Sequence, residues 1–106
     1  MAKYLIRGSY TADGTKGLLK DGGSKRVEVV EKVIAELGGK LDAFYYTFGD
    51  ADVLAIIDVP DPAAAAAFSL VVSATGAVQT STTPLLTPQE IDQACKKSVK
   101  YRAPGA

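Results

Sequence analysis

The side chains best suited to chemistry in this sequence are cations, phenols, a carboxylate and a hydroxyl. Arginine and lysine bind anions, a phenol serves as an acid or a hydrogen-bond donor, and a carboxylate serves as a base. The candidate ligand-binding residues are Arg7, Lys16, Tyr45, Tyr46, Asp52 and Thr80. Because no motif fixes their relative geometry, the sequence predicts a binding site without naming a catalytic residue.

The composition narrows the chemistry further. The chain has no histidine, which is the commonest general base and the usual ligand of haem, zinc and non-haem iron. The single cysteine, Cys95, has neither a histidine to activate it nor a second cysteine for an internal disulfide, so we interpret it as structural. Asp50 and Asp52 alone are too few ligands for Ca²⁺ or Mg²⁺. We therefore expect no metal site and no cofactor.

Arg7 lies in a segment that alternates like a β-strand. Between Lys3 and Tyr10, apolar side chains occupy one face and Arg7 lies on the other. A charge midway along a strand must reach solvent, a carboxylate of a partner subunit or a bound anion, because burying it unpaired is costly. An ion pair, a solvated edge and a ligand contact all stay open for this residue.

Lys16 belongs to a glycine-rich stretch, residues 11–23, in which we expect a short helix or turn from Thr15 to Lys20. The glycines match neither the dinucleotide-binding nor the P-loop pattern, which disfavours a phosphate site. Lys16 and Lys20 are four residues apart and share one helical face, a spacing typical of a solvated surface.

Two strand-like runs within Lys40 to Val59 flank the turn Gly49-Asp50-Ala51 and predict an antiparallel hairpin. Both of its faces are largely apolar. Tyr45 and Tyr46 point to opposite faces, so one belongs to the core and the other to a pocket or an interface. Helices on one side of a sheet leave the other face wet, so we expect a second layer, most simply another copy of the chain.

A helix is predicted on each side of the hairpin. Ser24 is expected to cap a helix that runs to about Leu37, and Asp61 one that runs from Pro62 to about Thr75. The second helix has no charged residue, which is typical of a tightly packed helix or of one in a subunit contact. We expect Ile57 and Phe68 to lie at such contacts between subunits.

The last part of the chain predicts a strand, a helix and a tail. Thr80 lies in the expected strand, Ala77 to Leu86, where it lines a polar pocket or simply belongs to a threonine-rich edge. Thr87 to Glu90 is a capping box that begins a short helix. From Ser98 onward we expect a loose tail or one that embraces a neighbour.

In chain order these elements form the βαββαβ pattern of an α+β, ferredoxin-like fold, with a four-stranded antiparallel sheet, helices on one face and an extra C-terminal helix. We expect a single domain over residues 1–98 and a flexible tail over 99–106. The uncovered apolar face predicts a homo-oligomer, either a dimeric α+β barrel or a ring.

Charge and hydropathy limit the partners. Twelve basic residues balance twelve acidic ones, so no overall field draws the chain to nucleic acid or to an anionic membrane. The apolar stretches are too short to cross a bilayer, and no signal peptide is recognisable. We expect a cytoplasmic protein that binds neither nucleic acid nor membrane.

Motifs spread over nearly the whole chain resemble those of one known family. They are Tyr10-Thr11-x-x-Gly14-x-Lys16, Leu19-Lys20-Asp21, Arg26, Glu36-Leu37-Gly38-Gly39-Lys40, Tyr45-Tyr46-Thr47-x-Gly49-x-x-Asp52, Pro60-Asp61 and Gly76-x-Val78-x-Thr80. By these motifs the chain is similar to GYD domain proteins. It departs from them at Ala51, where the tyrosine in the family's name would stand. The resemblance implies a ferredoxin-like domain of small bacterial and archaeal proteins, and it implies no activity.

Two functions fit these observations. The first is an oligomeric module that binds a small molecule or a partner and needs no catalytic group. The second is a cofactor-independent monooxygenase or isomerase of the dimeric α+β barrel type, acting on an aromatic or anionic substrate. There a tyrosine would be the acid, Arg7 would bind the anion and Asp52 would be the base.

Overall fold

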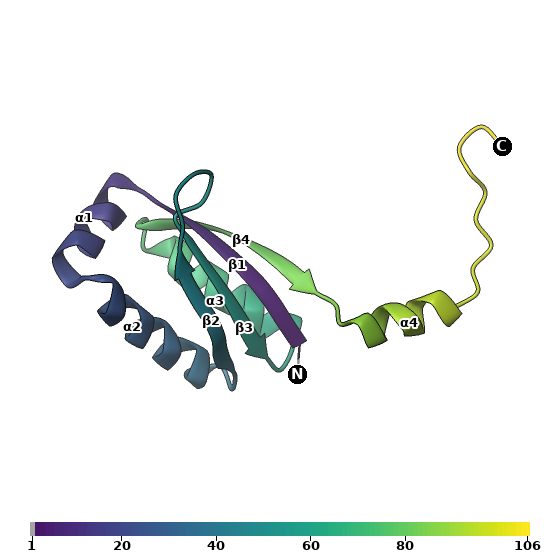
Figure 1. Cartoon of the computed structure of the whole chain (residues 1–106), viewed down its shortest axis with the longest axis horizontal. Helices are drawn as coiled ribbons and strands as arrows, with labels where there is room; N and C mark the ends of the chain where they lie inside the picture. Colours follow the sequence, from purple (N-terminus) through teal and green to yellow (C-terminus); the bar gives the residue numbers. More distant parts are fainter. Residues whose placement is uncertain (1) are drawn as a thin grey trace.

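The computed structural model describes residues 2–106. Its centre is a four-stranded sheet in the order β2-β3-β1-β4, in which all neighbouring strands are antiparallel (Figure 1). The strands are β1 (Ala2–Tyr10), β2 (Lys40–Tyr46), β3 (Val53–Val59) and β4 (Val78–Leu85). The helices are α1 (Ala12–Asp21), α2 (Gly23–Glu36), α3 (Pro62–Ala74) and α4 (Pro88–Lys96). This order confirms the predicted α+β, ferredoxin-like architecture.

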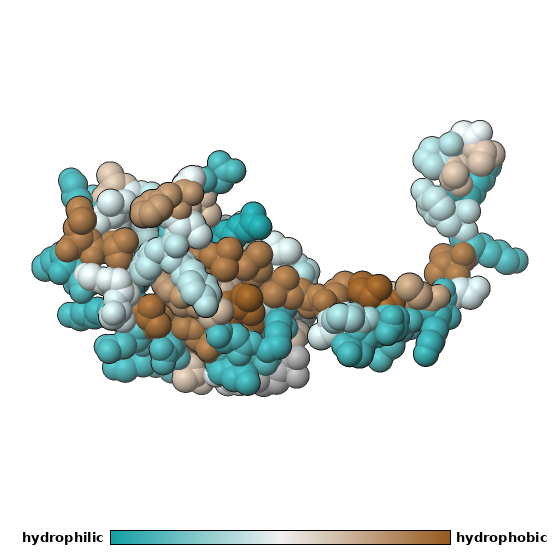
Figure 2. Space-filling model, in the orientation of Figure 1, coloured by the Kyte–Doolittle hydropathy of each residue, from teal (hydrophilic) through white to brown (hydrophobic). Residues whose placement is uncertain are grey.

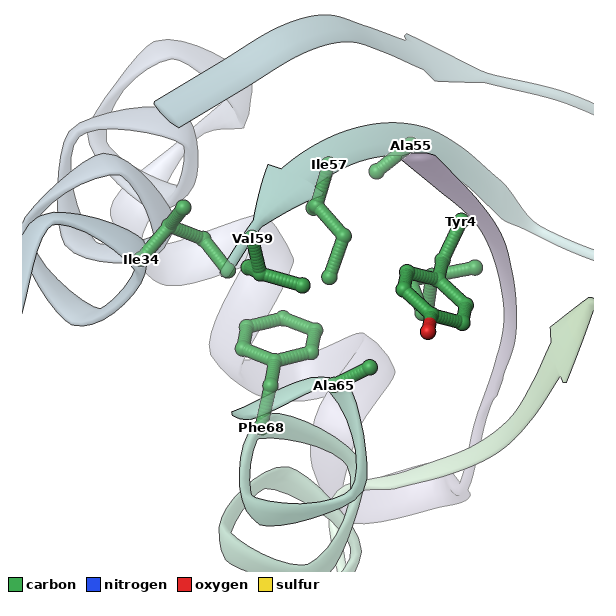
Figure 3. Packing of buried hydrophobic residues seen from close by; sticks show 8 residues of the cluster. Tyr4, Ile34, Ala55, Ile57, Val59, Ala65 and Phe68 are labelled. Carbon is green, nitrogen blue, oxygen red and sulfur yellow. The ribbon is translucent and has the colours of Figure 1, made fainter. Parts of the chain in front are cut away.

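The hydrophobic core lies between one face of the sheet and helices α2 and α3 (Figure 3). Strands β1 and β3 supply most of the sheet's contribution, because apolar residues alternate along each of them. The buried cluster consists of Tyr4, Ile6, Ile34, Ala55, Ile57, Val59, Ala65 and Phe68. We call this side of the sheet the core face and the other side the open face.

The expectation that Ile57 and Phe68 lie at subunit contacts is wrong. Ile57 is 0% exposed and Phe68 is 4% exposed, and both point into the core (Figure 3). Strand periodicity separates the two faces of β3 but does not say which face the helices cover. The apolar residues of β3 that lie on the open face are instead Leu54 and Ile56, which pair with Arg7 and Leu5 of β1.

Several helix ends follow the predicted local signals. The side chain of Asp61 accepts a hydrogen bond from the Ala64 amide at the start of α3, and Thr87 and Glu90 form the capping box of α4. Ser24 does not cap α2, which begins at Gly23 directly after α1 and has no side-chain cap. The helix α1 is also longer than expected, because Thr11 caps it through the Gly14 amide.

The hairpin of β2 and β3 differs from the prediction at its turn. Strand β2 ends at Tyr46, so Phe48 is fully exposed in a loop that spans residues 47–52. A bulge between Leu41 and Ala43 shifts the pairing of β2 with β3. Tyr45 and Tyr46 still lie on opposite faces, as the alternation predicts.

Helix α4 stands away from the rest of the chain (Figure 1). None of its residues is buried, and the segment after it, residues 97–106, contains no strand or helix. The radius of gyration is 17.0 Å, compared with about 13 Å for a compact domain of this length. Within residues 2–106, every helix is too short or too polar to span a membrane.

Candidate functional site

The predicted site residues separate into distinct groups. Tyr46 and Asp52 meet in a cleft at the end of the sheet beside α1, and Thr80 lies on the core face nearby. Arg7 and Tyr45 lie on the open face, on the other side of the sheet. Lys16 is exposed on α1 and does not line the cleft. The strongest candidate site is therefore the cleft.

This tyrosine cleft has a volume of about 420 Å³, which lies in the range of small-molecule sites. It forms where the start of α2, the body of α1 and the 47–52 loop approach the end of the sheet. Its lining residues are Tyr10, Thr15, Leu18, Gly23, Tyr46, Thr47, Phe48 and Asp52. Most of this lining is apolar, with phenol, hydroxyl and carboxylate groups at a few points.

Tyr46 forms one wall of the tyrosine cleft. Its hydroxyl donates to the carbonyl oxygen of Gly23 at 3.0 Å, and its ring packs edge-to-face on Phe44 with centroids 5.3 Å apart. A Cβ at position 23 would lie 3.0 Å from the Tyr46 ring, so a glycine there lets α2 begin against it. These contacts hold the phenol in one orientation.

The Tyr46 phenol stays protonated well above neutral pH. Burial raises its pKa above the ordinary value of 10.0, the neighbouring Tyr10 phenol raises it further, and the Arg26 guanidinium lowers it by a smaller effect. A protonated phenol donates a hydrogen bond and is a poor base. Because its single O–H already donates to the Gly23 carbonyl, Tyr46 is suited to accept a hydrogen bond from a donor group of a ligand through its oxygen.

Asp52 has a structural role in the cleft. Its carboxylate accepts a hydrogen bond from the Tyr10 amide at 2.8 Å, and its own amide donates to the Gly8 carbonyl at 2.8 Å. Its carbonyl also accepts from the Thr47 amide at 2.8 Å. These bonds fix the 47–52 loop on β1, so the Asp52 carboxylate shapes the turn.

A smaller cavity of about 60 Å³ lies behind the cleft, between the core face and the helices α2 and α3. Its lining is apolar except for Tyr10, Arg26 and Thr80. The Thr80 hydroxyl lies 3.1 Å from that of Ser73, and the Thr82 hydroxyl lies 2.6 Å from that of Ser69. The threonines of β4 thus tie α3 to the edge strand, and the cavity has room for only a few waters.

Arg7 lines a separate hollow of about 330 Å³, whose other lining residues are Ser9, Asp50, Ala51, Gln79, Thr80 and Ser81. Of the predicted site residues, the structure therefore brings Arg7 and Thr80 to one hollow. Tyr45 lies two strands away in the same row, because Leu54 pairs with both residues. Tyr45 is 66% exposed, whereas Tyr46 is 38% exposed. The structure therefore does not bring Arg7 and Tyr45 together with Tyr46 and Asp52.

A charged group occupies the other end of the open face. The Lys3 ammonium forms ion pairs with Asp42 and, at 3.2 Å, with Asp58. The hydrogen bond to Asp42 raises the pKa of Lys3, with a further contribution from Asp58. One oxygen of Asp58, Oδ1, is buried and has no partner among the described residues. No three potential metal ligands of the His, Cys, Asp or Glu types cluster anywhere in residues 2–106.

Sequence reasoning missed Tyr10 and Arg26 as site residues. Tyr10 lines both the tyrosine cleft and the small cavity, and Arg26 lines the cavity from α2. Both residues are among the motifs shared with GYD domain proteins, and these motifs are the signal in the sequence that could have identified them as site residues. Neither stands near the hairpin in the sequence, so only the packing of α1 and α2 on the sheet shows their proximity.

Comparison with known proteins supports one relationship. Neither a search of curated proteins nor a search of solved structures found a match. The family model of the GYD domain matches residues 4–95, which include most of β1, the other three strands and the tyrosine cleft. The chain therefore belongs to the GYD domain family.

Proposed function

We propose that this protein is a homo-oligomeric module that binds a small aromatic molecule with a hydrogen-bond donor in the tyrosine cleft. The observation that carries the proposal is the pair of phenols, Tyr10 and Tyr46, that line this mostly apolar cleft, with the Tyr46 hydroxyl fixed by its hydrogen bond to Gly23. Apolar walls at Leu18 and Phe48 favour a flat, apolar ligand body. The cytoplasmic location expected from the sequence is part of the same proposal.

Binding is better supported than catalysis. The carboxylate considered as the base, Asp52, is occupied by the Tyr10 amide. The phenol considered as the acid, Tyr46, has a raised pKa, which makes proton release harder. Arg7 lies on the opposite face of the sheet from both. These groups therefore do not support a monooxygenase or isomerase site, which needs an acid, a base and an anion-binding group around one substrate.

The homo-oligomer is proposed to form through the open face. Leu5, Leu54 and Ile56 are only partly covered there, and Tyr45 is largely exposed. Within residues 2–106, no helix packs on this face (Figure 1). Two such faces packed together would remove the apolar rows from water, as in other pairs of stacked sheets.

The ligand proposal is tested by titrating the isotope-labelled protein with phenol, whose hydroxyl is a hydrogen-bond donor, while recording amide NMR spectra. We expect shifts concentrated at the cleft residues, and we expect Tyr46→Phe to weaken binding about fivefold or more through loss of one hydrogen bond. Tyr45→Phe is the matched control, because it removes the neighbouring hydroxyl on the opposite face. Shifts centred on the open face, or equal affinities for both variants and the natural protein, would contradict the proposal.

A further inference from the structure

The C-terminal arm, residues 86–106, carries an apolar side that nothing in the described chain covers. Ile91 and Cys95 lie four residues apart on one side of α4, and Ile91 is 47% exposed. Leu86, Val99 and Tyr101 are exposed along the same arm. Figure 2 shows a hydrophobic strip on one side of the arm and hydrophilic residues on the other.

A surface outside the arm must stabilise this helix. The helix α4 has nine residues, whereas isolated helices shorter than about 12–15 residues are marginal in water. Its capping box contributes on the order of 1 kcal/mol, which does not replace tertiary packing. The strongly amphipathic pattern is typical of a helix that lies on an apolar surface.

The charge of the arm indicates what kind of surface this is. The charged residues of the arm are Glu90, Asp92, Lys96, Lys97, Lys100 and Arg102. The arm therefore has an excess of positive charge, and because the whole chain has a net charge of +0, the rest of the chain has a matching excess of negative charge. A docking surface on another copy of this chain is thus electrostatically favourable.

One groove on the helix layer fits both properties of the arm. This helix groove, between α1, α2 and α3, has a volume of about 370 Å³ and a mostly apolar lining that includes Val29 and Val71. Val71 is 59% exposed, on a helix without a charged residue. Asp13 and Asp21 lie at the groove together with Arg26, so acidic groups outnumber basic ones there.

The arm does not lie in the helix groove of its own chain. The groove includes Val78 at the start of β4, while the arm leaves from the end of β4 after Leu85. An eight-residue strand is about 26 Å long, and the arm continues away from the sheet (Figure 1). To reach the helix groove of its own chain, the arm would have to turn back along the sheet, whereas the groove of a neighbouring copy requires no such turn. Two copies can exchange their arms symmetrically.

We propose that the arm of each copy docks in the helix groove of a neighbouring copy. Ile91 and Cys95 contact Val29 and Val71 of that copy, and the basic residues after α4 lie toward Asp13 and Asp21. The uncharged outer surface of α3 then serves as a subunit contact. The arrangement does not depend on a ligand in the tyrosine cleft, so it stands or falls independently of the proposed function.

A mixed cross-linking experiment tests the docking. The natural chain, with Cys95 as its single thiol, is mixed with a size-tagged chain that carries Val71→Cys and Cys95→Ser, and a short bis-maleimide is added. We expect a cross-linked species that contains one copy of each chain. The control chain carries Thr83→Cys and Cys95→Ser, which places the thiol on the open face opposite Leu5. A cross-link to this control, or no mixed species with Val71→Cys, would overturn the proposal.

The reactivity of Cys95 provides a second, independent measurement. Docking protects the thiol, so alkylation by iodoacetamide should slow about tenfold or more when the protein concentration is raised into the range where copies associate. Ile91→Glu should abolish this protection, whereas Gln93→Glu adds the same charge on the opposite side of α4 and should retain it. The body of the fold does not depend on either residue, because no residue of α4 is buried against it. Equal protection at all concentrations would place the arm on its own chain and refute the exchange.

Discussion

At the scale of single residues, the two adjacent tyrosines of β2 show how position alone creates different chemistry. Tyr45 lies on the open face and Tyr46 at the tyrosine cleft, because side chains alternate along a strand. Only Tyr46 has a hydrogen bond to backbone and a ring partner. The sequence predicts the opposite faces, but the choice of face depends on the helices.

The alkaline titration of the tyrosines should reveal this difference. Because burial raises the pKa of Tyr46 in the folded protein, the folded state binds that proton more tightly than the unfolded state. The resulting stability is present below the ordinary pKa of 10.0 and is lost as the pH rises through the folded pKa. We expect an ultraviolet titration to show a tyrosine that ionises above the ordinary pKa of 10.0, and we expect this component to be absent from Tyr46→Phe. Tyr45→Phe should retain this component. If Tyr45→Phe loses it and Tyr46→Phe retains it, the phenol with the raised pKa is Tyr45 and not Tyr46.

Asp52 tests the same site through the backbone. Asp52→Ala leaves the part-buried Tyr10 amide without its acceptor, which should lower the free energy of unfolding by about 1–3 kcal/mol. The control, Asp50→Ala, removes an exposed side chain for which no hydrogen bond is found among the described residues and should change it by less than about 0.5 kcal/mol. Urea denaturation measures both. Equal effects of the two variants would show that the Asp52 carboxylate does not hold the loop.

At the scale of elements, local signals in the sequence predict those boundaries that depend on local contacts. Asp61 and Thr87 cap their helices as expected, because each bonds to an amide three residues ahead. Ser24 can also cap a helix, but α2 already begins at Gly23. Gly22, with a φ angle of 82°, is the single residue between α1 and α2, so Ser24 lies inside α2 and not at its N-cap. Phe48 matches a strand pattern, yet β2 ends earlier because Thr47 already bonds to Asp52 across the turn.

Two glycines of α1 should respond in opposite directions to alanine. A Cβ at Gly14 would lie 2.0 Å from the Ala77 carbonyl oxygen, so Gly14→Ala must push α1 from the sheet and should cost at least about 1–3 kcal/mol. No atom lies within 4 Å of a Cβ at Gly17, so Gly17→Ala should stabilise the helix by up to about 1 kcal/mol. Thermal unfolding of both variants measures the difference. Similar melting temperatures would mean that α1 does not pack as described.

At the scale of the whole molecule, the sequence predicts the order of the strands better than it predicts the contacts between subunits. The fold follows from element order and alternation, which are properties of the single chain. The assignment of Ile57 and Phe68 to subunit contacts failed because both faces of β3 are apolar, and only the packing of α3 identifies the core face. The tyrosine cleft was predicted only in part for the same reason, since Tyr10 and Arg26 reach it through tertiary packing.

The open face should respond to charge differently from the core. Tyr45→Lys places a cation on a largely exposed position, so the chain should stay folded while its sedimentation coefficient falls through loss of the contact at the open face. Ile57→Asp places a carboxylate in a fully buried position and should unfold the chain. Ala35→Lys, on the exposed side of α2, is the control with the same added charge as Tyr45→Lys. If Tyr45→Lys leaves the sedimentation coefficient unchanged, the contact between subunits does not lie on the open face.

The most direct test of a ligand-binding oligomer is native mass spectrometry of the full-length protein, in conditions that preserve subunits and small ligands. We expect an oligomer that carries a stoichiometric small-molecule mass, or that takes up added phenol. Tyr46→Phe should reduce this bound mass, and Tyr45→Phe should retain it. A monomer would contradict the role of the open face. An oligomer whose bound mass is the same in both variants would contradict the role of the tyrosine cleft.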